Sequence, residues 1–432
     1  MASTYIKRDL SVSETIYKYT WSAWIKRTGL GVAGDLFKSR ADGNNWVQAY
    51  LETDNKFILQ SYKNGGYHYN YKTNRVFRDV NGWYHFVINV DSSQGTAGDR
   101  VRIYVNGERI TSFGTSTNNL SNGDTLIFNT SDSGTGHTIG SWNAGTYFDG
   151  LMSHVHYSSG YSYAPTVFGS TDSTTGEWKI ITSPTFTLGG NGYTVLKDGN
   201  TITDQSSNSN DFTLGGGTLS NTKDCPSNVF CTMNSLAAGS DMTFGNGSTK
   251  IRNDVGTWNS GLGTIAMGTG KYYWEVYVHG GGDNNTGVTL SSADGTTHSS
   301  VDAGRVVYSR NGYIYREGLS GQGNVSTGVT YADGDYIGVA FDSENGVLTF
   351  YKNGTAVTNG ATTDTSFLRT NNEYIPQCGL YNGGEFRFNF GNGAFGSTQL
   401  TGTTYQGDGN NGIFKYDPPT GFTALSTKGL NQ

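Results

Sequence analysis

Two residues with carboxylate side chains, Glu52 and Asp54, are separated by a single residue in the sequence. Retaining glycoside hydrolysis needs two carboxyl groups about 5 to 5.5 Å apart, one acting as nucleophile and the other as acid/base. Here Asp54 begins a predicted turn, which its side chain favours by hydrogen-bonding to the nearby backbone. The sequence contains no Gly-x-Ser-x-Gly elbow and no phosphate loop. We therefore expect turn residues rather than a catalytic pair, and a protein that is not an enzyme.

Histidine and cysteine residues offer little metal-binding chemistry. His154 and His156 share one face of a predicted strand, but neither has an acidic or cysteine neighbour at ligand spacing. The three cysteines provide too few ligands for a zinc site. We expect all three thiols to be reduced and buried, with a disulfide bond between Cys225 and Cys231 as the alternative.

Aromatic residues could provide stacking surfaces for sugar rings, while neighbouring Asn and Asp side chains bind the hydroxyl groups. Three tyrosines alternate between residues 67 and 71, so we expect them to share one face of a strand. They could instead form a ladder that shields the sheet or is buried against another subunit. A second aromatic segment, residues 141–147, surrounds a glycine turn. The candidate glycan-binding residues of the first half are Tyr67, Tyr69, Tyr71, Trp142, Asn143 and Tyr147.

The second half contains further candidates at predicted loops and strand edges. Tyr313 and Tyr315 share one face of a predicted strand and Ile314 lies on the other, so an ordinary structural strand is the alternative. The candidate receptor-binding residues here are Asp283, Asn284, Tyr313, Tyr315 and Arg316.

Composition excludes several classes of partner. The net charge is −6, and no Lys/Arg cluster is longer than a pair such as Lys26-Arg27, so we expect no binding to nucleic acid. No run of about 18 apolar residues exists, and the first residues form no apolar signal segment, so we expect no membrane insertion and no secretion signal.

Glycine-rich turns between aromatic strands indicate an all-β fold. Glycine contributes 63 of 432 residues, about twice its usual share, and proline only 6. Asn106-Gly107 and Asn353-Gly354 each follow an alternating apolar strand and predict type I′ hairpins. Because one hairpin lies in each half, we expect two β-sandwich domains of jelly-roll type in tandem.

The first half contains, in order, Trp21-Ser22-Ala23-Trp24-Ile25-Lys26-Arg27, Gly82-Trp83-Tyr84-His85-Phe86, Tyr104-Val105-Asn106-Gly107, Ile139-Gly140 and Phe148-Asp149-Gly150. This order resembles the laminin-G-like jelly roll of the concanavalin A-like lectin/glucanase superfamily, over about residues 1–160. Glucanases of that superfamily carry Glu-x-Asp-x-x-Glu or a close variant, and the segment after Glu52 lacks the third acid. Some of the lectin-like jelly rolls hold Ca²⁺, so residues 42–45 remain a calcium candidate, although their spacing fits no defined loop.

The second half resembles a SPRY domain over about residues 225–398, through residues 270–276, 334–342, 346–354 and 386–391. Residues 161–224 are polar, and we expect a connector without a core of its own that packs against both domains. Residues 399–432 form a C-terminal extension.

The start of the chain at residues 2–8, the segment at 204–212 and the ending at 416–425 resemble structural proteins of marine tailed bacteriophages. This resemblance implies a tail-fibre or tail-tip adhesin on the virion surface, in contact with other virion structural proteins and host-surface carbohydrate. A virion protein is assembled in the host cytoplasm, in agreement with the missing signal. The alternatives are a capsid decoration or head-fibre protein and a glycan hydrolase.

Tail fibres are usually trimers, so we expect a homo-oligomer, with a trimer favoured. The sequence has no heptad-patterned stalk, so the contacts must come from the sandwiches, the connector or the C-terminal segment. The apolar residues of that segment could instead fold back as an extra strand. They are Tyr405, Phe414, Tyr416, Pro418, Pro419 and Phe422.

Overall fold

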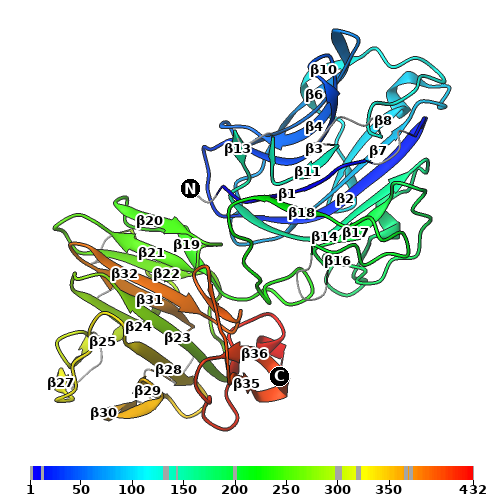
Figure 1. Ribbon diagram of the computed structural model, residues 1–432. Helices are drawn as coiled ribbons and strands as arrows, with labels where there is room; N and C mark the ends of the chain where they lie inside the picture. The colour runs from blue at the N-terminus through cyan, green and yellow to red at the C-terminus, as the bar shows by residue number, and fades with distance from the viewer. Residues whose placement is uncertain are drawn as a thin grey trace. The chain divides into compact units, whose positions relative to one another are not determined.

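The computed structural model describes residues 3–10, 14–129, 136–142, 145–197, 202–296, 304–317, 323–363, 368 and 373–431. The chain divides into two compact units, Met1–Leu219 and Ser220–Gln432 (Figure 1). Within the described residues, strands are joined by turns and short 3₁₀ segments and there is no α-helix, so the predicted all-β fold is confirmed. None of these described segments is a helix that could cross a bilayer.

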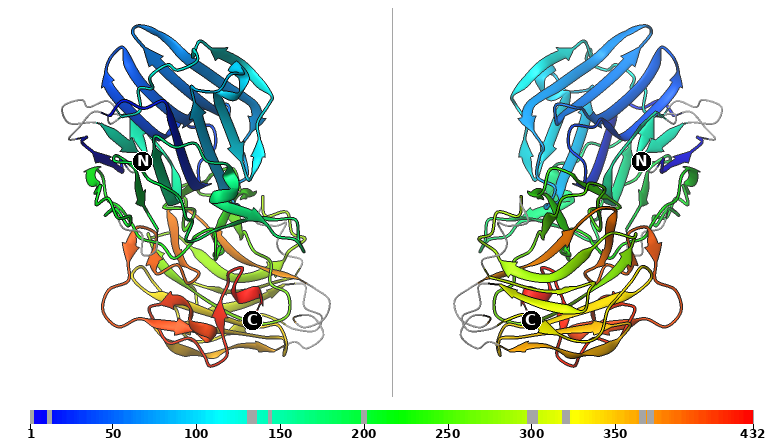
Figure 2. Two further views of the ribbon diagram at one scale, coloured as in Figure 1. Left: turned by 90° about the vertical axis from the view of Figure 1, so that its right-hand side faces the viewer. Right: turned by 90° about the vertical axis from the view of Figure 1, so that its left-hand side faces the viewer.

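The first unit consists of two main antiparallel sheets, which form the layers of blue and cyan strands in Figure 2. Sheet A has the order β10 (Phe113–Asn118), β6 (Gly66–Val76), β5 (Lys56–Lys63), β4 (Asn45–Leu51), β3 (Gly34–Asp42), β11 (His137–Ile139), β1 (Tyr5–Arg8) and β18 (Thr213–Gly216). Sheet B has the order β17 (Tyr193–Val195), β14 (Gly150–Ser159), β2 (Lys18–Arg27), β7 (Tyr84–Asp91), β8 (Val101–Val105) and β9 (Glu108–Arg109).

Alternating residues of both sheets meet in the core of the first unit. Trp21 packs on Phe37, and Phe57 on Phe86, with ring centroids 4.7 Å apart in each pair. Strand β2 is buried along nearly its whole length, on both faces. On its second face, Trp24 stacks on His85 of β7 with centroids 4.6 Å apart, and the Trp178 indole Nε1 donates a hydrogen bond of 2.9 Å to His85 Nδ1.

Residues 161–219 belong to the first unit and are not a separate connector. Strand β17 pairs with β14, β18 pairs with β1, and a small hairpin joins β15 (Gly169–Thr171) to β16 (Trp178–Ile180). The side chains of Tyr193, Val195 and Phe212 lie in the core of that unit. The segment needs no core of its own because its scattered apolar residues complete the core of the first unit.

Both predicted Asn-Gly hairpins are present. Asn106 and Gly107 have φ angles of 50° and 81°, and Asn353 and Gly354 have 51° and 80°. Two consecutive positive φ angles are the requirement of a type I′ turn. The upstream strands predicted for each copy, β7 and β28 (Tyr336–Asp342), pair with the first hairpin strands β8 and β29 (Val347–Lys352).

The second unit is also built from two main sheets. Sheet C has the order β19 (Met233–Ala238), β22 (Asn259–Gly263), β31 (Tyr374–Leu380), β24 (Asn284–Leu290), β25 (Arg305–Ser309), β26 (Tyr313–Glu317) and β27 (Val325–Ser326). Sheet D has the order β20 (Met242–Gly245), β21 (Lys250–Asn253), β32 (Gly384–Asn389), β23 (Lys271–His279), β28, β29 and β30 (Thr355–Thr363).

The C-terminal segment folds back onto sheet D. Along this edge of β23, β32 pairs with residues 275–279 and leaves the start of the strand open. There β37 (Thr423–Ala424) pairs in parallel with Tyr272 and Tyr273. Phe414, from β36 (Asn411–Phe414), packs on the Tyr273 ring with centroids 5.0 Å apart. Leu425 is fully buried in the main core of the unit. The described part of the segment is thus an integral piece of the second sandwich.

Candidate glycan-binding face

A bulge in β6 separates the three tyrosines that were expected on one face. Ser61 lies opposite Tyr69, whereas the next residue, Tyr62, lies opposite Tyr67, so β6 carries one extra residue here. Tyr69 and Tyr71 therefore point into the core and are 1% and 7% exposed, while Tyr67 is 42% exposed. The predicted shared face was wrong, and Tyr69 and Tyr71 cannot stack on a ligand from outside.

Tyr67 ends an aromatic row across the outer face of sheet A. Trp46 lies opposite Tyr62 in the β4–β5 ladder, and their rings stack with centroids 5.5 Å apart and 13° between the planes. Tyr62 and Tyr67 form the next pair. The edge of one ring meets the face of the other, with centroids 5.3 Å apart. Trp46 and Tyr62 are half-buried. The row presents aromatic surface from three neighbouring strands.

A polar row runs beside the aromatic row on the same face, two residues away along β4 and β5 and three residues away along the bulged β6. Lys38, Gln48, Gln60 and Asn70 are successive cross-strand partners from β3 to β6. Their sequence neighbours, such as Val47 and Leu59, lie in the core, so strand alternation directs the polar side chains outward. Gln60 Nε2 donates to Asn70 Oδ1 at 3.2 Å, and Gln48 Nε2 donates to Asp35 Oδ1. Amide groups of this kind suit sugar hydroxyl groups, which both donate and accept.

The polar row is close to electrically neutral at pH 7. Burial and the nearby Arg40 guanidinium together lower the pKa of Lys38 to about 6, against the opposing effect of Asp35. Lys38 Nζ lies 5.4 Å from the centre of the Trp46 ring. A lysine that is mostly uncharged at pH 7 favours a neutral ligand over an anionic one.

Glu52 and Asp54 are tied to a single lysine at the end of this face. Lys72 Nζ lies 2.8 Å from Glu52 Oε2 and 2.9 Å from Asp54 Oδ2. The hydrogen bonds to Glu52 and Asp54 raise the pKa of Lys72. Burial favours the neutral form of Asp54, but the bonds from Lys72 and the Lys56 amide hold its pKa below the usual range. A general acid needs the opposite shift.

The segment around residue 142 forms a hairpin against sheet A. Strand β12 (Ser141–Trp142) pairs with β13 (Thr146–Tyr147), and Thr146 Oγ1 donates to Asp35 Oδ2 at 2.6 Å. The half-buried Tyr147 has its ring 6.3 Å from that of Tyr5. For Trp142 the structure describes the backbone, and Asn143 lies outside the described residues.

The predicted metal and calcium candidates have other partners. His154 and His156 are buried with rings 6.3 Å apart, and each bonds a hydroxyl group, Ser153 Oγ at 2.7 Å and Thr194 Oγ1 at 2.9 Å. Asp42 accepts hydrogen bonds from Asn45 Nδ2 and the Asn44 amide, which lower its pKa. In the part of the chain that the structure describes, no three His, Cys, Asp or Glu residues converge as a metal site.

All three cysteines are free thiols, so the alternative Cys225–Cys231 bond is not formed. Cys231 and Cys378 are buried in the core of the second unit, as expected, whereas Cys225 is half-buried. Burial raises the pKa of the Cys378 thiol to about 12.

In the second unit the predicted receptor-binding residues differ in their exposure to solvent. Asn284 is fully buried at the start of β24, and its Nδ2 donates to Gly282 O at 3.1 Å, so it cannot reach an external ligand. Tyr313 is 42% exposed, and its ring lies 6.2 Å from that of Tyr315. Arg316 points to the other face of β26, with its Nε 2.8 Å from Gly323 O. Asp283 is exposed.

The two halves of the chain match different protein families. Residues 2–166 match the concanavalin A-like lectin/glucanases superfamily, and residues 271–393 match the SPRY domain family. No curated protein shows significant sequence similarity to this chain.

Solved structures show more distant likeness. The SPRY domain of human HERC1 is 20% identical, with 36% of this chain and 96% of that domain covered and a TM-score of 0.29. A heptameric SAP-like pentraxin from Limulus polyphemus is 17% identical, with 36% of this chain and 69% of that chain covered and a TM-score of 0.26. On the family matches, the first part of the chain is similar to the concanavalin A-like lectin/glucanases superfamily and the second part to the SPRY domain family.

Proposed function

We propose that this protein is a non-enzymatic adhesin that binds a neutral glycan on the outer face of sheet A. Its lectin-like and SPRY domains support a role in binding carbohydrate or protein. The observation that carries the proposal is the aromatic row of Trp46, Tyr62 and Tyr67 beside the half-buried amides of Gln60 and Asn70.

The two rows match the two chemistries of a sugar. The apolar face of a sugar ring stacks on an aromatic ring, and its hydroxyl groups exchange hydrogen bonds with carboxamides. Strands lie about 4.8 Å apart, so the aromatic row spans roughly 10 Å across β4, β5 and β6. We infer that a short stretch of polysaccharide lies across these strands, and that binding needs no cofactor.

The same proposal places the protein on a virion surface, as part of a tail fibre or tail tip, or as a capsid decoration. It rests on the resemblance of residues 2–8, 204–212 and 416–425 to phage structural proteins. A trimer would present three copies of the face to one surface, and several weak sites together give strong attachment. Labelling of intact particles with antibody against the purified protein, followed by electron microscopy, would show the location. Unlabelled particles would refute it.

Binding can be tested by calorimetric titration of the full chain with neutral oligosaccharides of glucose, mannose, galactose and N-acetylglucosamine. Trp46→Ala and Tyr67→Ala should each weaken binding at least tenfold, which corresponds to about 1.4 kcal/mol. Tyr405→Ala, at an exposed tyrosine of the second unit, is the matched control and should leave affinity unchanged. Equal affinity of all three variants and the wild type would refute this face as the site.

The alternative of a glycan hydrolase is tested separately. The ion pairs of Glu52 and Asp54 with Lys72 support a structural role for both carboxylates. The purified protein should release no reducing sugar from the same oligosaccharides, and Glu52→Gln should bind them like the wild type. Turnover that disappears in Glu52→Gln would establish an enzyme instead.

A further inference from the structure

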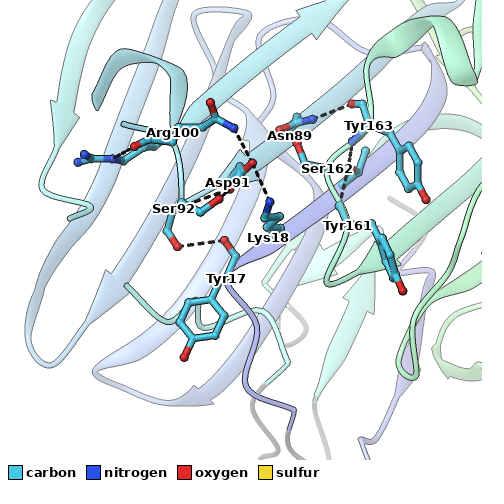
Figure 3. Close-up of polar contacts among 12 residues, drawn as sticks. Tyr17, Lys18, Asn89, Asp91, Ser92, Arg100, Tyr161, Ser162 and Tyr163 are labelled. Carbon is cyan, nitrogen blue, oxygen red and sulfur yellow. Dashed lines mark hydrogen bonds and ion pairs between the residues drawn. The ribbon is translucent and has the colours of Figure 1, made fainter. Parts of the chain in front are cut away.

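Two exposed tyrosines lie on neighbouring backbone segments at one end of sheet B, away from the face described above. Tyr17 immediately precedes β2 and is 46% exposed, and Tyr161 follows β14 and is 44% exposed. The amide of Gly160 donates to the carbonyl oxygen of Lys18 at 3.0 Å, which holds the two segments together. In Figure 3 both rings point away from the polar network at their base. We call Tyr17, Tyr161 and Tyr163 the tyrosine cluster.

The backbone under each exposed ring is fixed by hydrogen bonds. The amide and hydroxyl of Ser92 donate to the Tyr17 carbonyl oxygen at 2.9 and 3.1 Å. Thr20 Oγ1 donates to the Tyr161 carbonyl oxygen at 3.1 Å and accepts from the Tyr163 amide at 2.9 Å. Aromatic side chains on a backbone already ordered lose little entropy when they bind a ligand.

A buried asparagine organises the polar side of the cluster. Asn89 is 2% exposed, and its Nδ2 donates to the Tyr163 carbonyl oxygen at 2.7 Å. Its Oδ1 accepts from Ser162 Oγ at 2.8 Å and from the Arg102 guanidinium at 3.1 Å. Ser162 and Arg102 are themselves half-buried, and Arg102 also donates to Ser162 Oγ at 3.3 Å.

Lys18 has a charged partner beside the cluster. Its side chain is 39% exposed and lies 3.4 Å from Asp91 Oδ2, and the Asp91 side chain is 3% exposed. Burial favours the neutral form of Asp91, but hydrogen bonds from Ser93 and Gln94 hold its pKa below the usual range. The carboxylate therefore stays ionised and compensates the lysine.

We propose that the tyrosine cluster is a second saccharide-binding site, independent of the aromatic row on sheet A. The rings of Tyr161 and Tyr163 are nearly parallel, 21° apart with centroids 6.3 Å from each other, and Tyr17 adds a further aromatic surface.

A protein partner fits the cluster less well. A stable protein interface buries at least about 1,000 Å² around an apolar centre. The large hydrophobic side chains of the cluster are tyrosines only, set among Ser, Asn, Lys and Asp side chains. A small, polar, rigid aromatic surface suits a sugar better. With two sites on one unit, a polysaccharide chain could be held at two points, which raises avidity without new contacts.

The test uses the full chain and the same four neutral oligosaccharides, titrated by calorimetry against Tyr17→Ser/Tyr161→Ser. For at least one sugar, the double variant should show one binding event where the wild type shows two, or its affinity should be at least tenfold lower. Tyr67→Ala should not reproduce that loss, and Tyr405→Ser serves as the matched control. The double variant should melt like the wild type because both rings are exposed.

Four results would overturn the second site. The first is an unchanged titration of every sugar by the double variant, and the second is no binding of any of the four sugars to the wild type. The third is a fall in oligomer mass of the double variant in sedimentation velocity, which would make the cluster an interface between protein chains. Loss of binding in Trp46→Ala and Tyr67→Ala alone would support the face on sheet A and refute the cluster.

Discussion

Tyr67 and Tyr69 lie two residues apart on β6 and point to opposite faces of sheet A. Tyr69 hydrogen-bonds through its hydroxyl group to the Tyr19 hydroxyl group at 2.8 Å inside the core, while Tyr67 meets Tyr62 on the outer face. The extra residue of the bulge reverses the alternation between them. One irregularity in the ladder therefore converts a core position into a ligand-accessible position.

Substitution of these two tyrosines should separate stability from binding. Tyr69→Ala removes a fully buried ring and should cost about 3 kcal/mol or more of the free energy of unfolding of the first unit. Tyr67→Ala should cost less than about 0.5 kcal/mol, because the ring is exposed. Urea denaturation measures both values. A large destabilisation by Tyr67→Ala would mean that the ring is structural.

The stability of the first unit should rise between about pH 6 and pH 10. Burial lowers the pKa of Lys38 to about 6, whereas an unfolded lysine titrates near 10.4. In that window the unfolded chain binds a proton that the folded state lacks, so raising the pH favours folding. Lys38→Met should flatten this part of the profile, measured by urea denaturation from pH 6 to 9.5. An unchanged slope in the variant would contradict the assignment to Lys38.

The second unit should show the opposite dependence at lower pH. Burial raises the pKa of Glu275 to about 7, although hydrogen bonds from the Lys415 and Tyr416 amides and from Asn389 oppose the shift. An unfolded glutamate titrates near 4.3, so between these values the folded state holds a proton that the unfolded chain has lost. Stability conferred by Glu275 is complete below about pH 4 and is lost as the pH rises through 7.

Glu275→Gln should remove this loss, because the amide resembles the protonated carboxyl group. The variant should match the wild type near pH 5 and remain stable toward pH 8, as followed by differential scanning calorimetry. If the wild type became more stable between pH 5 and 7, or if the variant kept the wild-type slope, the role of Glu275 would be wrong.

Cleavage near residues 219 and 220 should yield two folded fragments, 1–219 and 220–432. A fragment ending at residue 160 should be unstable, because it lacks Tyr193, Val195 and Phe212 of the core and loses both β17 and β18. Circular dichroism and thermal melts of the three fragments provide the comparison. Cooperative melting of fragment 1–160 at the temperature of fragment 1–219 would restore the idea of a separate connector.

Deletion of residues 399–432 should unfold the second unit rather than change only its oligomeric state. The deletion removes Phe414 and Leu425 from buried clusters and strips Glu275 Oε1 and Oε2 of two amide donors, at 2.8 and 2.9 Å. Removal of a partner from a buried polar group costs about 1 to 3 kcal/mol, in addition to the lost packing. A truncated protein with a native melting profile would show that the fold-back is dispensable.

The elements that could be predicted from sequence are those with local signals. Asn106-Gly107 and Asn353-Gly354 determine their turns through backbone conformations that few other residue pairs adopt, and the strands beside them alternate in the usual way. The two domain resemblances rest on blocks of such strands. The reduced cysteines followed from their small number and apolar surroundings.

The elements that were missed depend on pairing between distant strands. Trp46 and Tyr62 become neighbours only through the β4–β5 register, and the bulge opposite Ser61 leaves no mark in the composition of β6. A turn at residues 53–55 would have placed Gln48 opposite Gln60, a signal available from the sequence. For residues 161–219, isolated aromatic residues looked insufficient because the core that they complete lies elsewhere in the chain.

The closing strand pair of the first unit has a mechanical consequence. Tyr5, at the start of β1, lies opposite Gly216, at the end of β18, and Lys7 lies opposite Thr213. Because the strands are antiparallel, the two ends of the unit leave from the same end of this ladder. A pulling force applied through those ends would peel β18 away one hydrogen-bonded pair at a time, instead of shearing all the pairs together. A chain held under tension through the first unit would therefore yield first at this pair, where the released strand can fold back once the load is removed.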